Sequence, residues 1–379
     1  MTKDGTDLRE EYLNEKKRKA KKRWIRTVIM FYIRMIILIV MVSVIIMLIY
    51  EKKQLNEQIE TVTAEKEKLI SDINTNYITK EAAKELVVEN VSDDGREQLK
   101  EEMLEMFEDG DSVFTVLENV FDDKIVVQDM SGYYFYDVRD DIAKHGLNFD
   151  SFTYPTLNEE TGEVEGEVDY TGEGFTVKRG IDVSKFQENI DWEKVKDDGI
   201  DFVIMRCGYR GYGSGKIVED ETFEYNIKTC NELGIDAGVY FFTEAKNVAE
   251  GEEEADFVLD LLEEYDAKLQ LPIVIDVEQS SNPSKSRTKN VTPEERTDIV
   301  IAFCERVKEA GYEPMIYGNL KSHMRMTEID RLEEYRKWFA YFRTPLRYPY
   351  KFDIWQYTDK GKVDGIKGDI DINLMFVKE

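Results

Sequence analysis

The chain has 379 residues, a formal net charge of −28 at pH 7 and an aromatic content of 12%. This length is sufficient for two or three folded units, and the aromatic content is too high for a chain that is mostly disordered. The acidity argues against nucleic acid as a partner, because an acidic surface repels phosphates.

The first predicted elements are a basic tail and a membrane helix. Residues 1–27 contain ten Lys and Arg against five Asp and Glu, and the apolar run of residues 28–50 is interrupted only by Arg34 and Ser43. About 20 apolar residues are enough to span a bilayer. Because positive charge stays inside, the pattern predicts a cytoplasmic tail and a single-pass signal-anchor in the cytoplasmic membrane, with the rest of the chain extracytoplasmic. A cleaved signal peptide is the alternative, but the run is longer than a usual signal core and no small-residue cleavage site follows Tyr50.

Residues 51–76 are predicted to form a coiled-coil stalk. Apolar side chains occupy five of six positions that alternate by four and three residues: Leu55, Ile59, Val62, Lys66, Leu69 and Ile73. This spacing is typical of a coiled-coil seam. We expect the stalk to pair two copies into a homodimer, because membrane tethering raises their local concentration. The alternative is a single amphipathic helix that lies on its own chain.

A small α+β module is predicted over residues 77–157, and a linker or exposed hairpin over residues 158–178. The module is helical at first and then has two short strands around the Ser131-Gly132 turn. Its aromatic run, Tyr133 to Tyr136, is either a ligand-binding face or a set of core-packing side chains, and we favour packing.

Residues 179–379 alternate short apolar runs with amphipathic stretches, which predicts an α/β fold. The apolar runs are Arg179–Val183, Phe202–Cys207, Ala237–Phe242, Pro272–Val277, Met315–Tyr317, Trp338–Tyr341, Asp353–Gln356 and Ile370–Ile372. Strand–helix alternation of this kind indicates a parallel sheet, and eight strands indicate closure into a barrel. Since the later connections are too short for full helices, we expect an irregular TIM-like barrel with fewer helices than strands.

Four acidic residues fall at the ends of these predicted strands. Asp182 ends the first run, Asp276 and Glu278 end the fourth, and Asp371 lies in the eighth. In a parallel barrel the carboxyl ends of all strands open on one face, so these acids should meet at one mouth. A single such acid is usually a capping or solvated residue. Four buried together are costly without a function, and we interpret them as catalytic.

Several segments around these acids resemble, in the right order, the motifs of the family 25 glycoside hydrolases, the Chalaropsis-type lysozymes. They are Gly180–Ser184 with Gln187, Ile190–Trp192, Ile275–Glu278, Trp338–Tyr341, Trp355–Tyr357 and Asp369–Asn373. The resemblance implies an irregular barrel of eight strands and about five helices. It also implies a muramidase that cleaves the β-1,4 bond between N-acetylmuramic acid and N-acetylglucosamine in peptidoglycan glycan strands.

The resemblance also implies roles for the acids. Glu278 would be the general acid, and Asp276 would orient the 2-acetamido group of the substrate, an exception to the usual pair of catalytic carboxylates. Asp182 and Asp371 would position the sugar and set the electrostatics of the mouth. Side chains expected to stack on sugar rings, with core packing as the alternative for each, are Tyr240, Tyr317 and Trp355.

Other reactive residues are assigned no chemistry. Many relatives have a His after the Tyr of the third strand, whereas this chain has Phe241 after Tyr240, so one substrate hydrogen bond is in doubt. His145 and His323 lie outside any motif. The three cysteines lack metal-ligand spacing and are expected to be buried free thiols. No metal and no cofactor is expected.

Three functional hypotheses remain. The first is an active muramidase held at the outer face of the cytoplasmic membrane for local cell-wall remodelling. The second is a catalytically weak or inactive glycan-binding scaffold whose stalk and module recruit envelope partners. The third makes the stalk and module the main function. Retention of all four acids favours the enzyme, because a binding module does not require them.

Overall fold

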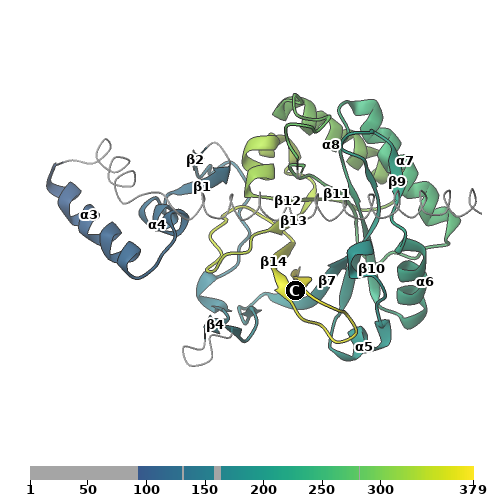
Figure 1. Cartoon of the computed structure of the whole chain (residues 1–379), viewed down its shortest axis with the longest axis horizontal. Helices are drawn as coiled ribbons and strands as arrows, with labels where there is room; N and C mark the ends of the chain where they lie inside the picture. Colours follow the sequence, from purple (N-terminus) through teal and green to yellow (C-terminus); the bar gives the residue numbers. More distant parts are fainter. Residues whose placement is uncertain (1–92, 130–131, 158–163, 281) are drawn as a thin grey trace, which may run out of the picture. The chain divides into compact units, whose positions relative to one another are not determined.

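The computed structural model describes residues 93–129, 132–157, 164–280 and 282–379 (Figure 1). The predicted tail, membrane helix and stalk of residues 1–76 therefore lie outside the described residues. Within the described ranges, no helix combines the length and the apolar character needed to cross a membrane.

The chain divides into two compact units between Val113 and Phe114. In the first unit the structure describes the helix α3 (Asp93–Glu108). The helix α4 (Val113–Val120) begins at the division. The second unit extends to Glu379 and contains the predicted barrel.

Eight strands of the second unit, all within the described residues, close into a barrel. Around the barrel they are β7 (Phe175–Val183), β8 (Phe202–Arg210), β10 (Asp236–Phe242), β11 (Ile273–Asp276), β12 (Pro314–Asn319), β13 (Arg336–Ala340), β14 (Ile354–Gly361) and β15 (Ile370–Lys378). Pairing of β8 with β10 and of β15 with β7 completes the ring. A short extra strand, β9 (Ile217–Glu219), pairs with β8 outside the ring. The predicted eight-stranded barrel is confirmed.

The last strand corrects the expectation of a fully parallel barrel. β15 runs antiparallel to both β14 and β7, whereas the other neighbours in the ring are parallel. Residues 362–369, which connect β14 to β15, are too few for the crossover that a parallel strand requires. Reversal of β15 places the beginning of this strand at the mouth, and Asp371 consequently pairs in register with Asp182.

Helices flank one part of the barrel more than the other. The described α-helices between the strands are α5 (Trp192–Asp197), α6 (Phe223–Leu233), α7 (Val248–Glu264) and α8 (Pro293–Glu309). Figure 1 shows α6, α7 and α8 along one side of the barrel. Among the described residues from β12 onward only short helical turns occur, η3 (Ser322–Met326) and η4 (Ile329–Leu332). About five helices were expected, and four α-helices accompany the described part of the barrel.

The segment before the barrel packs into the same core. It contains β1 (Lys124–Asp129) antiparallel to β2 (Gly132–Asp137), then η1 (Phe149–Ser151), β3 (Phe152–Thr153), β4 (Thr156–Leu157), β5 (Val164–Glu165) and β6 (Asp169–Tyr170). Phe152 contacts Tyr170 and the barrel side chains Trp355 and Phe376, at ring-centroid distances of 4.6, 5.6 and 6.0 Å. The compact unit therefore begins at Phe114, well before the barrel boundary expected at residue 179.

Candidate active site

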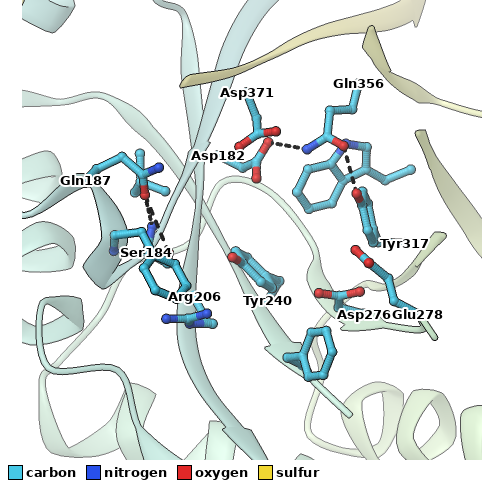
Figure 2. Close-up of a pocket in the computed structure, with 14 residues that line it drawn as sticks. Asp182, Ser184, Gln187, Arg206, Tyr240, Asp276, Glu278, Tyr317, Gln356 and Asp371 are labelled. Atoms are coloured by element: carbon cyan, nitrogen blue, oxygen red, sulfur yellow. Dashed lines mark hydrogen bonds between the residues drawn. The ribbon is translucent and has the colours of Figure 1, made fainter. Parts of the chain in front are cut away.

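A cavity of about 220 Å³ opens where the parallel strands end and β15 begins (Figure 2). Side chains from all eight barrel strands, and from the segments that follow β7 and β11, line it. The lining residues are Asp182, Val183, Ser184, Phe186, Gln187, Arg206, Tyr240, Phe242, Asp276, Glu278, Tyr317, Trp338, Gln356 and Asp371. All four acids expected at the mouth are among them.

Asp182 is held by a directed set of hydrogen bonds. Its Oδ2 accepts from Nε2 of Gln356 at 2.8 Å and from Nδ2 of Asn373 at 2.9 Å. The Trp338 indole donates to Oδ1 of Asn373 at 2.7 Å, and the Tyr317 hydroxyl donates to Oε1 of Gln356 at 2.7 Å. Because an indole N–H can only donate, it turns the Asn373 amide so that its N–H₂ faces Asp182. The carboxylate at the end of β7 is thus fixed directly by β14 and β15, and through them by β12 and β13.

Asp276 and Glu278 lie next to each other on the opposite wall (Figure 2). Asp276 ends β11 and Glu278 follows it by two residues, and both side chains line the cavity. Asp276 is buried, and its Oδ1 has no hydrogen-bond partner among the described residues. A buried carboxylate oxygen without a donor is unfavourable. This atom is therefore suited to accept a hydrogen bond from a ligand.

Burial raises the pKa of every acid in the cavity. The pKa of Glu278 is raised to about 7, and a contact with the Tyr317 hydroxyl limits this rise. Burial and the neighbouring Asp182 raise the pKa of Asp371 to about 8. The pKa of Asp182 is raised to about 6 despite its amide donors, and burial with the charge of Glu278 raises the pKa of Asp276 well above its ordinary value. The cluster consequently retains protons near neutral pH and can act as a proton donor.

The predicted stacking residues are only partly brought to the mouth. Tyr240 and Tyr317 line the cavity, but Trp355 does not. The side chain of Trp355 is fully buried and donates to the carbonyl of Tyr341 at 2.8 Å. Since side chains alternate along a strand, the presence of Gln356 in the cavity turns Trp355 away from it. The tryptophan at the mouth is Trp338.

Sequence analysis did not single out several residues that build this site. Trp338, Gln356 and Asn373 lay within the quoted motifs but were not assigned roles. Arg206 interrupts the apolar run of β8, and a charge inside such a run was the signal that could have found it.

The remaining reactive groups lie outside the cavity lining. His323 is buried, and its pKa is lowered to about 3 by burial. Cys207, Cys230 and Cys304 are buried free thiols, as expected. In the described part of the chain no three His, Cys, Asp or Glu side chains are grouped so that they could hold a metal ion.

An eight-stranded α/β barrel with adjacent carboxylates at its mouth, one of which retains its proton, is the arrangement that a glycoside hydrolase uses. Residues 181–366 match the family model described as Glycosyl hydrolases family 25. This part of the chain therefore belongs to the family 25 glycosyl hydrolases, and the expectation drawn from the motifs is confirmed.

Individual relatives share little sequence identity with this chain. Lysozyme M1 of Streptomyces globisporus is 26% identical over 204 residues, which cover 52% of this chain and 66% of that protein. The uncharacterized protein YegX of Escherichia coli K12 is 28% identical over 202 residues, 52% of this chain and 68% of that protein. Among solved structures, the modular autolysin LytC of Streptococcus pneumoniae has 26% identity and a TM-score of 0.49, with 68% of this chain covered and only 57% of the autolysin.

Proposed function

We propose that this protein is an N-acetylmuramidase that cleaves the β-1,4 bond between N-acetylmuramic acid and N-acetylglucosamine in peptidoglycan. The observation that carries the proposal is the adjacent pair Asp276 and Glu278 in the cavity, with a raised pKa on Glu278 and an unpartnered oxygen on Asp276. The match to the family 25 glycosyl hydrolases and the similarity to a lysozyme support peptidoglycan as the substrate.

The chemistry follows from these two side chains. Protonated Glu278 donates its proton to the glycosidic oxygen as the bond from that oxygen to C1 breaks. Oδ1 of Asp276 accepts the N–H of the 2-acetamido group, which turns the acetamido carbonyl oxygen toward C1 to form the new bond. Glu278, now ionised, removes a proton from the water that opens this cyclic intermediate. Asp182, held by its two amide donors, stabilises the positive charge that develops on the sugar, and Asp371 beside it positions the sugar.

Digestion of purified peptidoglycan by the detergent-solubilised full chain tests the proposal. We expect the wild type to release fragments whose reducing ends, after borohydride reduction and mass spectrometry, are on muramic acid. Glu278→Gln should slow this release by about 10³-fold, because a general acid contributes on the order of 10²- to 10⁴-fold. Glu264→Gln, at the exposed end of α7, serves as the matched control.

The products also separate the alternatives. Reducing ends on glucosamine would show that the other bond is cut and would contradict the proposed specificity. Absence of products from the wild type, with glycan binding intact, would favour the scaffold hypothesis.

We further propose that residues 28–50 anchor the enzyme at the outer face of the cytoplasmic membrane, and that residues 51–76 pair two copies. The support is the apolar run behind a basic tail in the sequence. Cells that express the full chain should retain it in the membrane fraction through a carbonate wash, and external protease should degrade the barrel in spheroplasts. A deletion of residues 28–50 should release it. Recovery of the intact full chain in the soluble fraction would overturn the anchor.

A further inference from the structure

The cavity has two chemically different ends. In Figure 2, Asp276 and Glu278 lie on one side, Ser184, Gln187 and Arg206 lie on the other, and Tyr240 stands between them. Arg206 is the one cation among the described residues that line the cavity. The proposed chemistry uses the side chains of the acidic end, and no step of it is assigned to the cationic end.

A dedicated counterion holds Arg206 in place. Its Nε and Nη2 lie 2.7 and 2.6 Å from Oδ2 of Asp220, a carboxylate whose side chain is fully buried. The same carboxylate accepts from the backbone N–H of Lys185 at 3.1 Å and from the backbone and hydroxyl of Thr222 at 3.0 and 2.8 Å. Asp220 is thus fully occupied, and it fixes one edge of the guanidinium.

The other edge of the guanidinium remains available. An arginine has five N–H donors in a rigid plane, and no partner for Nη1 occurs among the described residues. The Arg206 side chain is only 11% exposed. Placing a cation with its own counterion in a cavity is costly unless its remaining donors bind something. Carboxylates match this planar fork and form charge-assisted hydrogen bonds with it.

An exposed aromatic ring lies against the same guanidinium. Phe186 is 74% exposed, the highest value among the large apolar side chains of the described residues. Its ring centroid is 5.1 Å from Cζ of Arg206. The short turn that carries Phe186 is fixed by Ser184 and Gln187, whose side chains each bond to the backbone at the other end of the turn. A rigid, solvent-facing ring is a suitable surface for the apolar face of a sugar.

We propose that Arg206, positioned by Asp220, and Phe186 form a subsite that binds a sugar bearing a carboxylate. This inference rests on the proposed function and assigns a basis for substrate choice. The bound carboxylate is either the lactyl group of muramic acid or a carboxylate of the attached peptide. The enzyme therefore selects anionic glycan strands over otherwise identical neutral ones.

Matched substrates test this subsite. The first is peptide-free peptidoglycan glycan with free lactyl carboxylates, and the second is the same glycan with those carboxylates converted to methylamides. The third is glycan that still carries its peptides. With the full chain we expect kcat/KM on the free carboxylate, or on the peptide-bearing strand, to exceed that on the methylamide by about tenfold, as a charge-assisted hydrogen bond provides. Which of these two is preferred identifies the source of the carboxylate.

Two variants of Arg206 then separate recognition from folding. Arg206→Met should lower kcat/KM only on the anionic strand, so that the ratio of kcat/KM on the anionic strand to that on the methylamide strand falls to about one. Arg206→Lys should retain part of this ratio, because the positive charge remains. Arg306→Met, an exposed arginine on α8, should keep the full preference. An equal loss on both strands with Arg206→Lys would overturn the anion subsite.

Phe186→Ala provides a test that does not disturb the buried pair. Because the ring contacts the sugar and not the carboxylate, this change should lower kcat/KM on all strands by the same severalfold factor. No change would remove Phe186 from the subsite. A wild type that cleaves every strand without preference would overturn the subsite while the muramidase proposal stands, whereas failure to cleave any strand would contradict the muramidase itself.

Discussion

Two clusters of buried carboxylates in the same unit differ in how they are neutralised. At the N-terminal half of α7, Glu254 accepts from Nε of Arg210 at 2.6 Å and from the Thr243 hydroxyl at 2.6 Å. Nearby, Arg287 donates to both oxygens of Glu250 at 2.6 and 2.7 Å. Each of these acids has a cation beside it. At the mouth, four acids face one another, and the single lining arginine is already paired.

The difference shows which buried acids serve stability. Carboxylates matched with arginines join β8, α7 and the segment before α8, and these pairs hold the loops of the barrel together. At the mouth, burial and then the neighbouring acids raise the pKa of Asp276, and one of its oxygens has no donor. A fold retains such a cluster at a cost to its own stability, which is expected of a site selected for chemistry.

The largest expected effect distinguishes the clusters by activity. Asp276→Asn should lower the hydrolysis rate by about 10³-fold, because a preorganised group that acts on developing charge contributes on the order of 10²- to 10³-fold. The same change should not lower the thermal midpoint, because Oδ1 of Asp276 accepts no hydrogen bond that the substitution would remove. Rate measurements on peptidoglycan and calorimetry of the same sample test both. A lower midpoint together with lost activity would mean that Asp276 is structural.

The next effect concerns the paired cluster. Arg210→Met should destabilise the unit by about 3 kcal/mol, because it leaves the fully buried Glu254 without its cation. In contrast, Arg306→Met breaks an exposed pair with Asp256 and should cost less than about 1 kcal/mol. Denaturant unfolding of both variants measures the two losses. Equal losses would remove the distinction between buried and exposed pairs in this unit.

The smallest effect is a dependence of stability on pH. Between about pH 4.5 and 8 the folded state binds more protons than the unfolded state, because the folded pKa is about 7 for Glu278 and about 8 for Asp371. The free energy of unfolding should therefore fall as the pH rises through this window. Calorimetry from pH 5 to 8 measures the slope, and Glu278→Gln should flatten it. A rise in stability toward pH 8 would contradict the raised pKa values.

The alternation of apolar runs with amphipathic stretches along the sequence predicted the barrel well, since each predicted apolar run overlaps an observed strand. The four acids were found because strand ends share one face of a barrel. The direction of β15 was not found, because an apolar run carries no information about which way its neighbour runs. Trp355 was wrongly predicted to line the mouth for a related reason. Side chains alternate between the two faces of a strand, and the sequence does not show that Gln356, rather than Trp355, faces the cavity.

The segment before the barrel was the least predictable part. Its Glu- and Gly-rich stretch is typical of a linker, yet Val168 and Tyr170 within the predicted linker are buried in the core shared with the barrel. A few apolar residues in a polar stretch do not reveal what they pack against. Similarly, no local pattern could show that Asp220 supports Arg206, because their pairing depends on how β8 and the turn after β9 meet in three dimensions.

The reversed strand β15 also has a consequence for biosynthesis. Asn373 and Asp182 form a hydrogen bond although they are 191 residues apart in the sequence. A nascent chain on the ribosome has β7 and its aspartate early, but it lacks the partner strand that orients this aspartate until β15 has emerged. Long-range pairing of this kind forms late, because the intervening chain must first be ordered. The complete set of mouth residues can therefore form only after β15 has been synthesised and has paired with β14 and β7, because this strand carries both Asp371 and Asn373.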